Sequence, residues 1–270
     1  MNVIIVSGGK GTRVRPLTNE IPKTMIEVYG KTVLESQIEI YRNCGITDIT
    51  VVTGYQSEKI NLPNITCIKN EKYETTNVNE GIFCAKSKFN DSVIITYGDI
   101  IFDQEILEQS LNFKGDIGVV IDLDWKKQYT GKFGRPLSEA DNVIINEKQI
   151  LEIRKNIAEK EGFILAESIG MFHLSKRGAK IIADRYDYLK KSHKGRFHSA
   201  SSFTNALFND MIQDLIDTGI TVEPIPIKGK WCEVDFKIDL KRANEIFSYR
   251  SKLFLSVLQN ILIPTKVLIQ

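Results

Sequence analysis

The strongest constraint on the fold is the alternation of short apolar runs and amphipathic segments in the first half of the chain. The apolar run Val3–Val6 leads into a glycine-rich stretch, and the β-branched run Ile49–Thr53 ends at Gly54. Between them, Thr32–Asn43 carries apolar residues at helical spacing. The alternation continues with expected helices at 77–88 and 103–111 and expected strands at 93–96 and 117–121. Such βαβ units predict a Rossmann-like α/β fold, with a mostly parallel sheet and helices on both faces.

The second half of the chain has a different pattern. Two apolar runs, Asn142–Asn146 and Gln149–Arg154, predict a β-hairpin, which would be a small antiparallel elaboration of the sheet. The remaining expected elements are a strand at 168–174, a long helix from about 175, a helix at 199–218, a proline-containing edge strand at 221–227 and a helix at 239–248. The sequence has no internal repeat and no flexible linker. We therefore predict a single domain over residues 1–250, followed by a tail at 251–270.

Composition excludes several classes of protein. The 270 residues are 42% hydrophobic and 26% charged, so the chain has enough apolar content for a folded core. Lys and Arg number 36 against 34 Asp and Glu, and a net charge of +2 gives no reason to expect a nucleic-acid partner. The four cysteines form no C-x-x-C pair, so no zinc or redox motif is visible. No secretory signal is recognisable, and we expect a cytoplasmic protein.

The tail contains the longest apolar stretch, Leu253–Ile269. A membrane span needs about 20 nearly uninterrupted apolar residues, whereas polar residues and Pro264 interrupt this stretch. We therefore expect no membrane span. Apolar residues recur at helical spacing from Leu253 to Leu262, and soluble monomers rarely leave such a face exposed. The tail is expected either to dock on its own domain or to pack against another subunit, and we favour a homo-oligomer.

Removal of residues 251–270 should change self-association or solubility first, because the tail lies outside the motifs described below. Sedimentation velocity of the full-length and truncated proteins measures the effect. A monomeric full-length protein, or an oligomer that survives truncation unchanged, would contradict this prediction.

The segment Ser7-Gly8-Gly9-Lys10-Gly11-Thr12-Arg13 directly follows the first expected strand. Its three glycines allow backbone N–H groups to approach a ligand, and successive N–H groups form an anion-binding concavity. Lys10 and Arg13 add positive charge, so a polyphosphate is the expected ligand. The segment is neither a dinucleotide fingerprint, because Val14 stands where the third glycine belongs, nor a P-loop, because no Gly-Lys-Ser/Thr follows.

The motif extends to Lys23 as S-G-G-x-G-T-R-x-x-P-L-T-x-x-x-P-K. It resembles the signature of the nucleotidyltransferases that join an NTP to a sugar phosphate or a related phosphate. The resemblance implies a nucleotide-diphospho-sugar transferase type of fold, in which Arg13 and Lys23 act as catalytic residues on the nucleotide phosphates. It also implies a nucleotide-binding role for seven further residues: Ser7, Gly8, Gly9, Gly11, Thr12, Asn77 and Gly81.

Two aspartates are candidates for a metal site. Asp99 follows an expected strand, at the edge where α/β sheets bind ligands. Asp235 closes the segment Trp231-Cys232-Glu233-Val234-Asp235. Mg²⁺ is usually held by one or two carboxylates together with phosphate oxygens, and Asp99 and Asp235 resemble the metal-binding pair of the family. Taken alone, each would more often be a turn or capping residue, and Asp239 is an expected cap of the last helix.

The middle of the chain narrows the resemblance. Four segments (122–125, 129–131, 136–140 and 166–171) and the pattern Ile153-x-Lys155-x-Ile157 look like the cytidylyltransferases of phosphonate metabolism, which have phosphocholine cytidylyltransferases as relatives. The resemblance covers about residues 1–247. It implies CTP and a small phosphonate or phosphate acceptor, such as 2-aminoethylphosphonate. The candidate acceptor-binding residues are the aromatic Trp125, Tyr129 and Trp231, which could stack on a cation, and the acidic Glu167 and Glu233. Each of these residues has an equally available role in packing or in a solvated surface.

Departures from the family pattern leave alternatives open. Val78 and Gly81 replace an Asn and a Ser that relatives tend to have near the base, and Lys132 stands where an Arg is expected. One alternative is a sugar-1-phosphate uridylyl- or thymidylyltransferase, and another is a phosphocholine cytidylyltransferase. A third alternative is a nucleotide-binding regulatory module that lost catalysis. For an enzyme, we expect in-line attack of an ionised acceptor oxygen on the α-phosphorus, with positioning and charge stabilisation in place of a general base.

Overall fold

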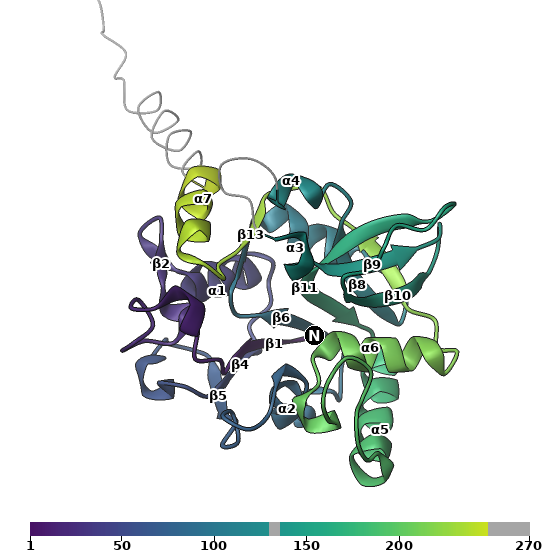
Figure 1. The fold of residues 1–270 in the computed structure, drawn as a ribbon. Helices are drawn as coiled ribbons and strands as arrows, with labels where there is room; N and C mark the ends of the chain where they lie inside the picture. Colours follow the sequence, from purple (N-terminus) through teal and green to yellow (C-terminus); the bar gives the residue numbers. More distant parts are fainter. Residues whose placement is uncertain (130–135, 248–270) are drawn as a thin grey trace, which may run out of the picture.

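A computed structural model describes residues 1–129 and 136–247. Within these residues the main sheet has nine strands (Figure 1). Four of them are parallel neighbours in the order β6-β1-β4-β5: β1 (Asn2–Ser7), β4 (Ile49–Thr53), β5 (Thr66–Lys69) and β6 (Val93–Tyr97). This confirms the predicted mainly parallel α/β fold. The tail at 251–270 and the position of Lys132 lie outside the described residues.

The other five strands extend the sheet beyond β6. They are β8 (Ile117–Asp122), β9 (Asp141–Ile145), β10 (Ile150–Lys155), β11 (Ile164–Leu174) and β12 (Glu223–Pro226). The long strand β11 pairs antiparallel with β9 through Ile164–Glu167 and with β6 through Met171–Leu174. β9 and β10 form the predicted hairpin, and β12 is an edge strand that pairs with β8 alone in this sheet. Apart from the parallel pair β8–β12, this part of the sheet is antiparallel, and it begins where β11 pairs with β6.

Helices cover both faces of the sheet (Figure 1). One face carries α2 (Val78–Cys84), α5 (Lys176–Ser192) and α6 (Phe208–Asp217), and the other carries α1 (Val33–Asn43) and α3 (Gln104–Leu111). Successive residues of β1 point to opposite faces: Ile4 packs in the first core, and Val3 and Ile5 pack in the second. The short α4 (Lys126–Tyr129) follows β8, and α7 (Lys237–Phe247) is the last described helix. No helix in the described residues is both long and apolar enough to cross a membrane.

Several predicted element boundaries differ from the structure, including the end of the helix predicted at 77–88, which is Cys84. α6 begins at Phe208 and not near Ser199, because the Asp210 carboxylate accepts hydrogen bonds from the backbone N–H groups of Leu207 (2.8 Å) and Ser199 (3.1 Å). β11 begins at Ile164, four residues before the predicted start, because this extension pairs with β9. Asp239 lies inside the first turn of α7 and is not the residue before it.

Two short ribbons lie outside the main sheet and were not predicted. β2 (Glu27–Val28) pairs with β3 (Lys31–Thr32) just before α1. β7 (Ile100–Phe102) pairs antiparallel with β13 (Trp231–Glu233). The second ribbon joins segments that are far apart in the chain, and it leads into the two aspartates that the sequence analysis singled out.

Candidate active site

The glycine-rich loop leaves the carboxyl end of β1 and folds over Thr18 and Lys23. Gly11 has φ +57°, and a Cβ at this position would lie 3.0 Å from Thr18 Cγ2 and 3.1 Å from Lys23 Cβ. The Thr18 hydroxyl donates to the Gly11 carbonyl at 2.7 Å. A side chain at position 11 would therefore strain the backbone and displace Lys23.

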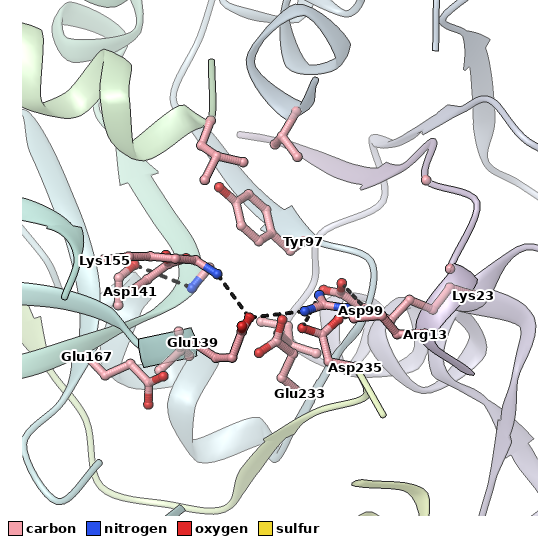
Figure 2. A pocket seen from close by; sticks show the side chains of 18 of the residues that line it. Arg13, Lys23, Tyr97, Asp99, Glu139, Asp141, Lys155, Glu167, Glu233 and Asp235 are labelled. Carbon is pink, nitrogen blue, oxygen red and sulfur yellow. Dashed lines mark hydrogen bonds and ion pairs between the residues drawn. The ribbon is translucent and has the colours of Figure 1, made fainter. Parts of the chain in front are cut away.

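The centre of the site is a network of two cations and several carboxylates (Figure 2). The Lys23 ammonium donates to Asp99 Oδ2 at 2.7 Å and to Asp235 Oδ1. The Arg13 guanidinium donates to Asp235 Oδ2 at 2.5 Å and to Glu139 Oε2 at 3.1 Å. Arg13 and Lys23 were predicted from one motif and Asp99 and Asp235 from two other segments, and ion pairs link all four side chains in the structure.

Lys23 and Asp235 each stabilise the ionised form of the other. Burial by itself would lower the pKa of Lys23, but the nearby charges of Asp99, Asp235 and Glu233 outweigh it, and the pKa lies above its ordinary value. Burial would raise the pKa of Asp235, but the charges of Lys23 and Arg13 and the hydrogen bond from Lys23 lower it to about 2. Both side chains are therefore ionised at neutral pH, and Lys23 is available as a fixed positive charge.

The β7–β13 ribbon explains why Asp99 and Asp235 meet. Asp99 lies in the turn between β6 and β7, and its carbonyl accepts from the Val234 N–H at 2.9 Å. Asp239 Oδ2 accepts from the N–H groups of Asp235 (2.8 Å) and Phe236 (2.7 Å). The predicted cap therefore acts from within α7, and it fixes the backbone of Asp235.

Three carboxylates at this point fit a divalent cation. Each of Asp99, Glu233 and Asp235 offers one oxygen, and these oxygens lie within 4.8 Å of one another. Asp99 Oδ1 is buried and has no hydrogen-bond partner among the described residues. Carboxylate oxygens are the ligands that Mg²⁺ prefers, and an orphaned buried oxygen is costly unless a ligand satisfies it.

Two neighbouring cavities open around this network. The larger, of about 320 Å³, extends from the glycine-rich loop to β9, β10 and β11. The smaller, of about 160 Å³, is lined by residues of β1, β4 and the segment 70–81. Gly9, Val78, Tyr97 and Asp99 line both cavities. The arrangement provides one large and one small compartment that meet beside the charged network.

Most of the predicted binding residues line these cavities. The larger cavity is lined by ten of them: Gly9, Gly11, Thr12, Arg13, Lys23, Asp99, Glu167, Trp231, Glu233 and Asp235. The smaller one includes Gly8, Asn77 and Gly81. Ser7 lines neither cavity in the described structure. The Ser7 hydroxyl packs against Gly98, and a Cβ added to Gly98 would lie only 2.2 Å from Ser7 Oγ.

Two of the three predicted aromatic residues lie elsewhere. Trp125 and Tyr129 are 4% and 6% exposed and pack with Ala140 and Leu165, outside the lining of both cavities in the described structure. Trp125 donates from its indole nitrogen to the Leu165 carbonyl at 3.2 Å, and Tyr129 donates to the Glu167 carboxylate. A hydrogen bond to Glu167 therefore connects Tyr129 to the larger cavity.

The far end of the larger cavity contains residues that the sequence analysis did not select. Glu139 accepts from Lys155 at 3.3 Å as well as from Arg13, so it lies between the two cations in Figure 2. Asp141 also lines this end, and burial raises its pKa to about 6 although the charge of Lys155 opposes the shift. Glu139 and Lys155 lie in sequence segments that indicated only the resemblance to a family and gave these two residues no role. Asp141 had no sequence signal beyond an acidic residue before a strand.

Gly170 shapes the wall between the charged network and this far end. It has φ +78°, and a Cβ there would lie 2.7 Å from the Tyr97 ring. The residue lies where the pairing of β11 with β8 changes register, between Ser168 and Phe172. A glycine at this position therefore allows β11 to bend around Tyr97.

Comparison with known proteins agrees with this architecture. Residues 2–134 match the nucleotidyl transferase family model. The chain is 31% identical over 252 residues to a CTP:phosphoglutamine cytidylyltransferase of Campylobacter jejuni, and the alignment covers 89% of this chain and 98% of that protein. It is also 28% identical to the bifunctional protein GlmU of Methanocaldococcus jannaschii, where the alignment covers 85% of this chain and 59% of the longer relative.

Solved structures share the fold at lower identity. The inositol-1-phosphate CTP transferase from T. maritima has a TM-score of 0.70 and 21% identity, over 92% of this chain and 94% of that one. The CTP:phosphocholine cytidylyltransferase from Streptococcus pneumoniae has a TM-score of 0.69 and 19% identity, over 91% and 98% of the two chains. With the predicted motifs gathered at one site and a relative aligned over nearly its whole length, this chain belongs to the nucleotidyl transferase family and is an enzyme that transfers a nucleotidyl group.

Proposed function

We propose that this protein is a Mg²⁺-dependent cytidylyltransferase that transfers CMP from CTP to a small phosphate or phosphonate acceptor and releases pyrophosphate. The observation that carries the proposal is the network of Lys23, Arg13 and three carboxylates at the junction of two cavities. The smaller cavity has room for a base. The larger one has room for the phosphates and a small acceptor.

The chemistry is an in-line displacement at the α-phosphorus of CTP. An oxygen of the acceptor phosphate or phosphonate forms the new bond, and the bond to pyrophosphate breaks on the opposite side. This oxygen is already ionised near pH 7, so no side chain has to remove a proton. Lys23 stabilises the charge that develops at the reacting phosphorus, and Arg13 contacts the departing pyrophosphate. A cation held by Asp99, Glu233 and Asp235 would neutralise phosphate charge when bound.

The use of CTP is supported by the relatives and by the small cavity. Relatives in sequence and in structure are named as enzymes that use CTP. The small cavity lies between the glycine-rich loop and α2, beside Asn77 and Gly81. Asn70 shapes its rim, because its side chain donates to the Thr76 hydroxyl at 3.0 Å and accepts from the Lys72 N–H at 3.0 Å.

The enzyme should use CTP or UTP at least ten times more efficiently than ATP or GTP, because the cavity of about 160 Å³ suits a pyrimidine. Initial rates of pyrophosphate release with each NTP measure this preference. A Gly81→Ala variant narrows the cavity without a clash, since the added Cβ would lie 3.5 Å from Val6 and 3.9 Å from Val52. This variant should raise KM for CTP and leave the fold intact. Equal efficiency of the wild type with ATP or GTP would refute the assignment of this cavity.

The acceptor end of the larger cavity supports an acceptor with charges of both signs. Lys155 provides positive charge for an anionic phosphate or phosphonate oxygen. Glu139, Asp141 and Glu167 provide carboxylates that suit a cationic nitrogen. 2-Aminoethylphosphonate combines both groups, and a phosphorylated amino acid of the kind used by the Campylobacter relative does so as well.

A screen of CTP, UTP, ATP, GTP and dTTP against a panel of acceptors tests the proposal. The panel contains 2-aminoethylphosphonate, phosphocholine, phosphorylated glutamine, inositol 1-phosphate and glucose 1-phosphate, with pyrophosphate release as the readout. Turnover with CTP and an amine-bearing acceptor is expected. Turnover restricted to glucose 1-phosphate with UTP or dTTP would favour the sugar-nucleotide alternative.

Oligomerisation through residues 251–270 and a cytoplasmic location remain predictions.

A further inference from the structure

The position of the Asp99 carboxylate depends on a turn, because Asp99 lies between two strands and not within one. Gly98 and Asp99 form a two-residue turn between β6 and β7. Its backbone is tied to β1 by a hydrogen bond from the Gly98 N–H to the Val6 carbonyl (2.9 Å). On the other side it is tied to the segment after β13 by the bond from the Val234 N–H.

A third attachment comes from Gln37 on α1. Its side-chain amide donates to the Tyr97 carbonyl at 2.9 Å and to the Ile100 carbonyl at 2.7 Å, which are the peptide groups on either side of the turn. Both partners are acceptors, so the NH₂ group has to face them. One amide group therefore clamps the two ends of the turn together.

The burial of Gln37 indicates that these two hydrogen bonds are its main contribution to the structure. The residue is 1% exposed, and its Oε1 has no hydrogen-bond partner among the described residues. A polar oxygen buried in this way destabilises the fold, so the benefit has to come from the NH₂ group. The helix that holds Gln37 is itself well fixed. Thr32 and Glu35 form a capping box at its start, and Leu34 and Ile38 pack in the core.

We propose that Gln37 is a positioning residue that holds the Gly98–Asp99 turn so that the Asp99 carboxylate stays within reach of Lys23, Glu233 and Asp235. The inference rests on the proposed function in one respect, namely that Asp99 helps to bind a divalent cation. Magnesium sites demand near-ideal geometry, and small displacements of catalytic groups cost large factors in rate. A turn released at both ends would lose that geometry while the fold persists.

Tyr41 offers a matched control on the same helix. It is 0% exposed, and its hydroxyl makes a hydrogen bond with Thr96 on β6, one residue before Tyr97. Gln37→Met and Tyr41→Phe therefore both remove buried hydrogen bonding between α1 and the end of β6. Only the first releases the turn.

The test compares these variants by three measurements. Gln37→Met should bind Mn²⁺ at least ten times more weakly than the wild type, as measured by electron paramagnetic resonance on the nucleotide-free protein. It should lower kcat about tenfold and change KM for CTP less than threefold. Hydrogen exchange of the Gly98 and Val234 amides should accelerate, with the central strands unaffected. Tyr41→Phe should stay within twofold in Mn²⁺ affinity, kcat and KM.

Further variants make the outcomes distinguishable. Gln37→Asn keeps the amide but is one methylene too short to reach both carbonyls, so it should shift the same measurements in the same direction and serves if Gln37→Met does not fold. Asp99→Asn should lose Mn²⁺ binding, and unchanged affinity there would overturn the metal assignment. If Asp99→Asn loses Mn²⁺ but Gln37→Met keeps wild-type affinity and amide exchange, the role of Gln37 is overturned. Equal losses in Gln37→Met and Tyr41→Phe would also overturn it, since they indicate a merely structural effect.

Discussion

Asp99→Asn should lower kcat at least 100-fold, which corresponds to about 2.7 kcal/mol of activation free energy. The substitution keeps the size of the side chain but removes the charge that faces Lys23 at 2.7 Å. It also replaces the carboxylate whose buried Oδ1 has no protein partner among the described residues. The expected loss comes from weaker binding of the cation and from a less fixed Lys23. Steady-state kinetics at several Mg²⁺ concentrations measure it.

Asp103→Asn is a suitable control for this experiment. Asp103 lies four residues further along, at the start of α3, and its carboxylate accepts from the Lys230 N–H at 3.2 Å. The same chemical change at this position should leave kcat within about threefold, because Asp103 does not line either cavity in the described structure. An Asp99→Asn enzyme with substantial activity at unchanged Mg²⁺ would contradict the metal assignment.

Lys23→Ala should lower kcat about 1,000-fold and raise KM for CTP by a much smaller factor. Removing one donor that stabilises transition-state charge costs about 100- to 1,000-fold in comparable sites. Here the loss is expected at the upper end, because the Lys23 side chain is only 14% exposed and water does not easily replace it. Separate determination of kcat and KM checks the prediction, since a group that acts in the transition state affects mainly kcat.

Two further variants serve as controls for Lys23→Ala. Lys23→Arg keeps the charge and should recover part of kcat. Lys31→Ala removes an exposed lysine that pairs with Glu39 at 2.5 Å, and it should be close to the wild type. A rise in KM with kcat unchanged would make Lys23 a residue that binds CTP in the ground state only.

Local sequence patterns were enough to predict most of the elements. The predicted strand Ile49–Thr53 has the same bounds in the structure, and the helix predicted over Thr32–Asn43 starts one residue later because Thr32 is its cap. The reason is that periodicity and capping act between residues a few positions apart. Boundaries shifted where a distant partner intervened, as when β9 extended β11 to Ile164.

The end of the larger cavity that we propose for the acceptor shows the limit of residue-type reasoning. Trp125 and Tyr129 were selected because aromatic rings bind cations, but their rings contact each other in a separate apolar cluster. Lys155 and Asp141 line the cavity instead. Side-chain direction in this part of the chain depends on the bend of β11 and on its pairing with β9. Neither the bend nor the pairing can be read from the residue types alone.

The sequence by itself determined the glycine-rich loop after β1, because the glycines between Ser7 and Arg13 act on the backbone where they stand. Only the tertiary structure decided which charges meet there. Lys23 and Asp235 are 212 positions apart in the chain and form an ion pair. They meet because the three-residue strands β7 and β13 pair, and such short strands have no periodicity to read. The contact between Gln37 and the Asp99 turn has the same origin, since it depends on how α1 packs against the end of β6.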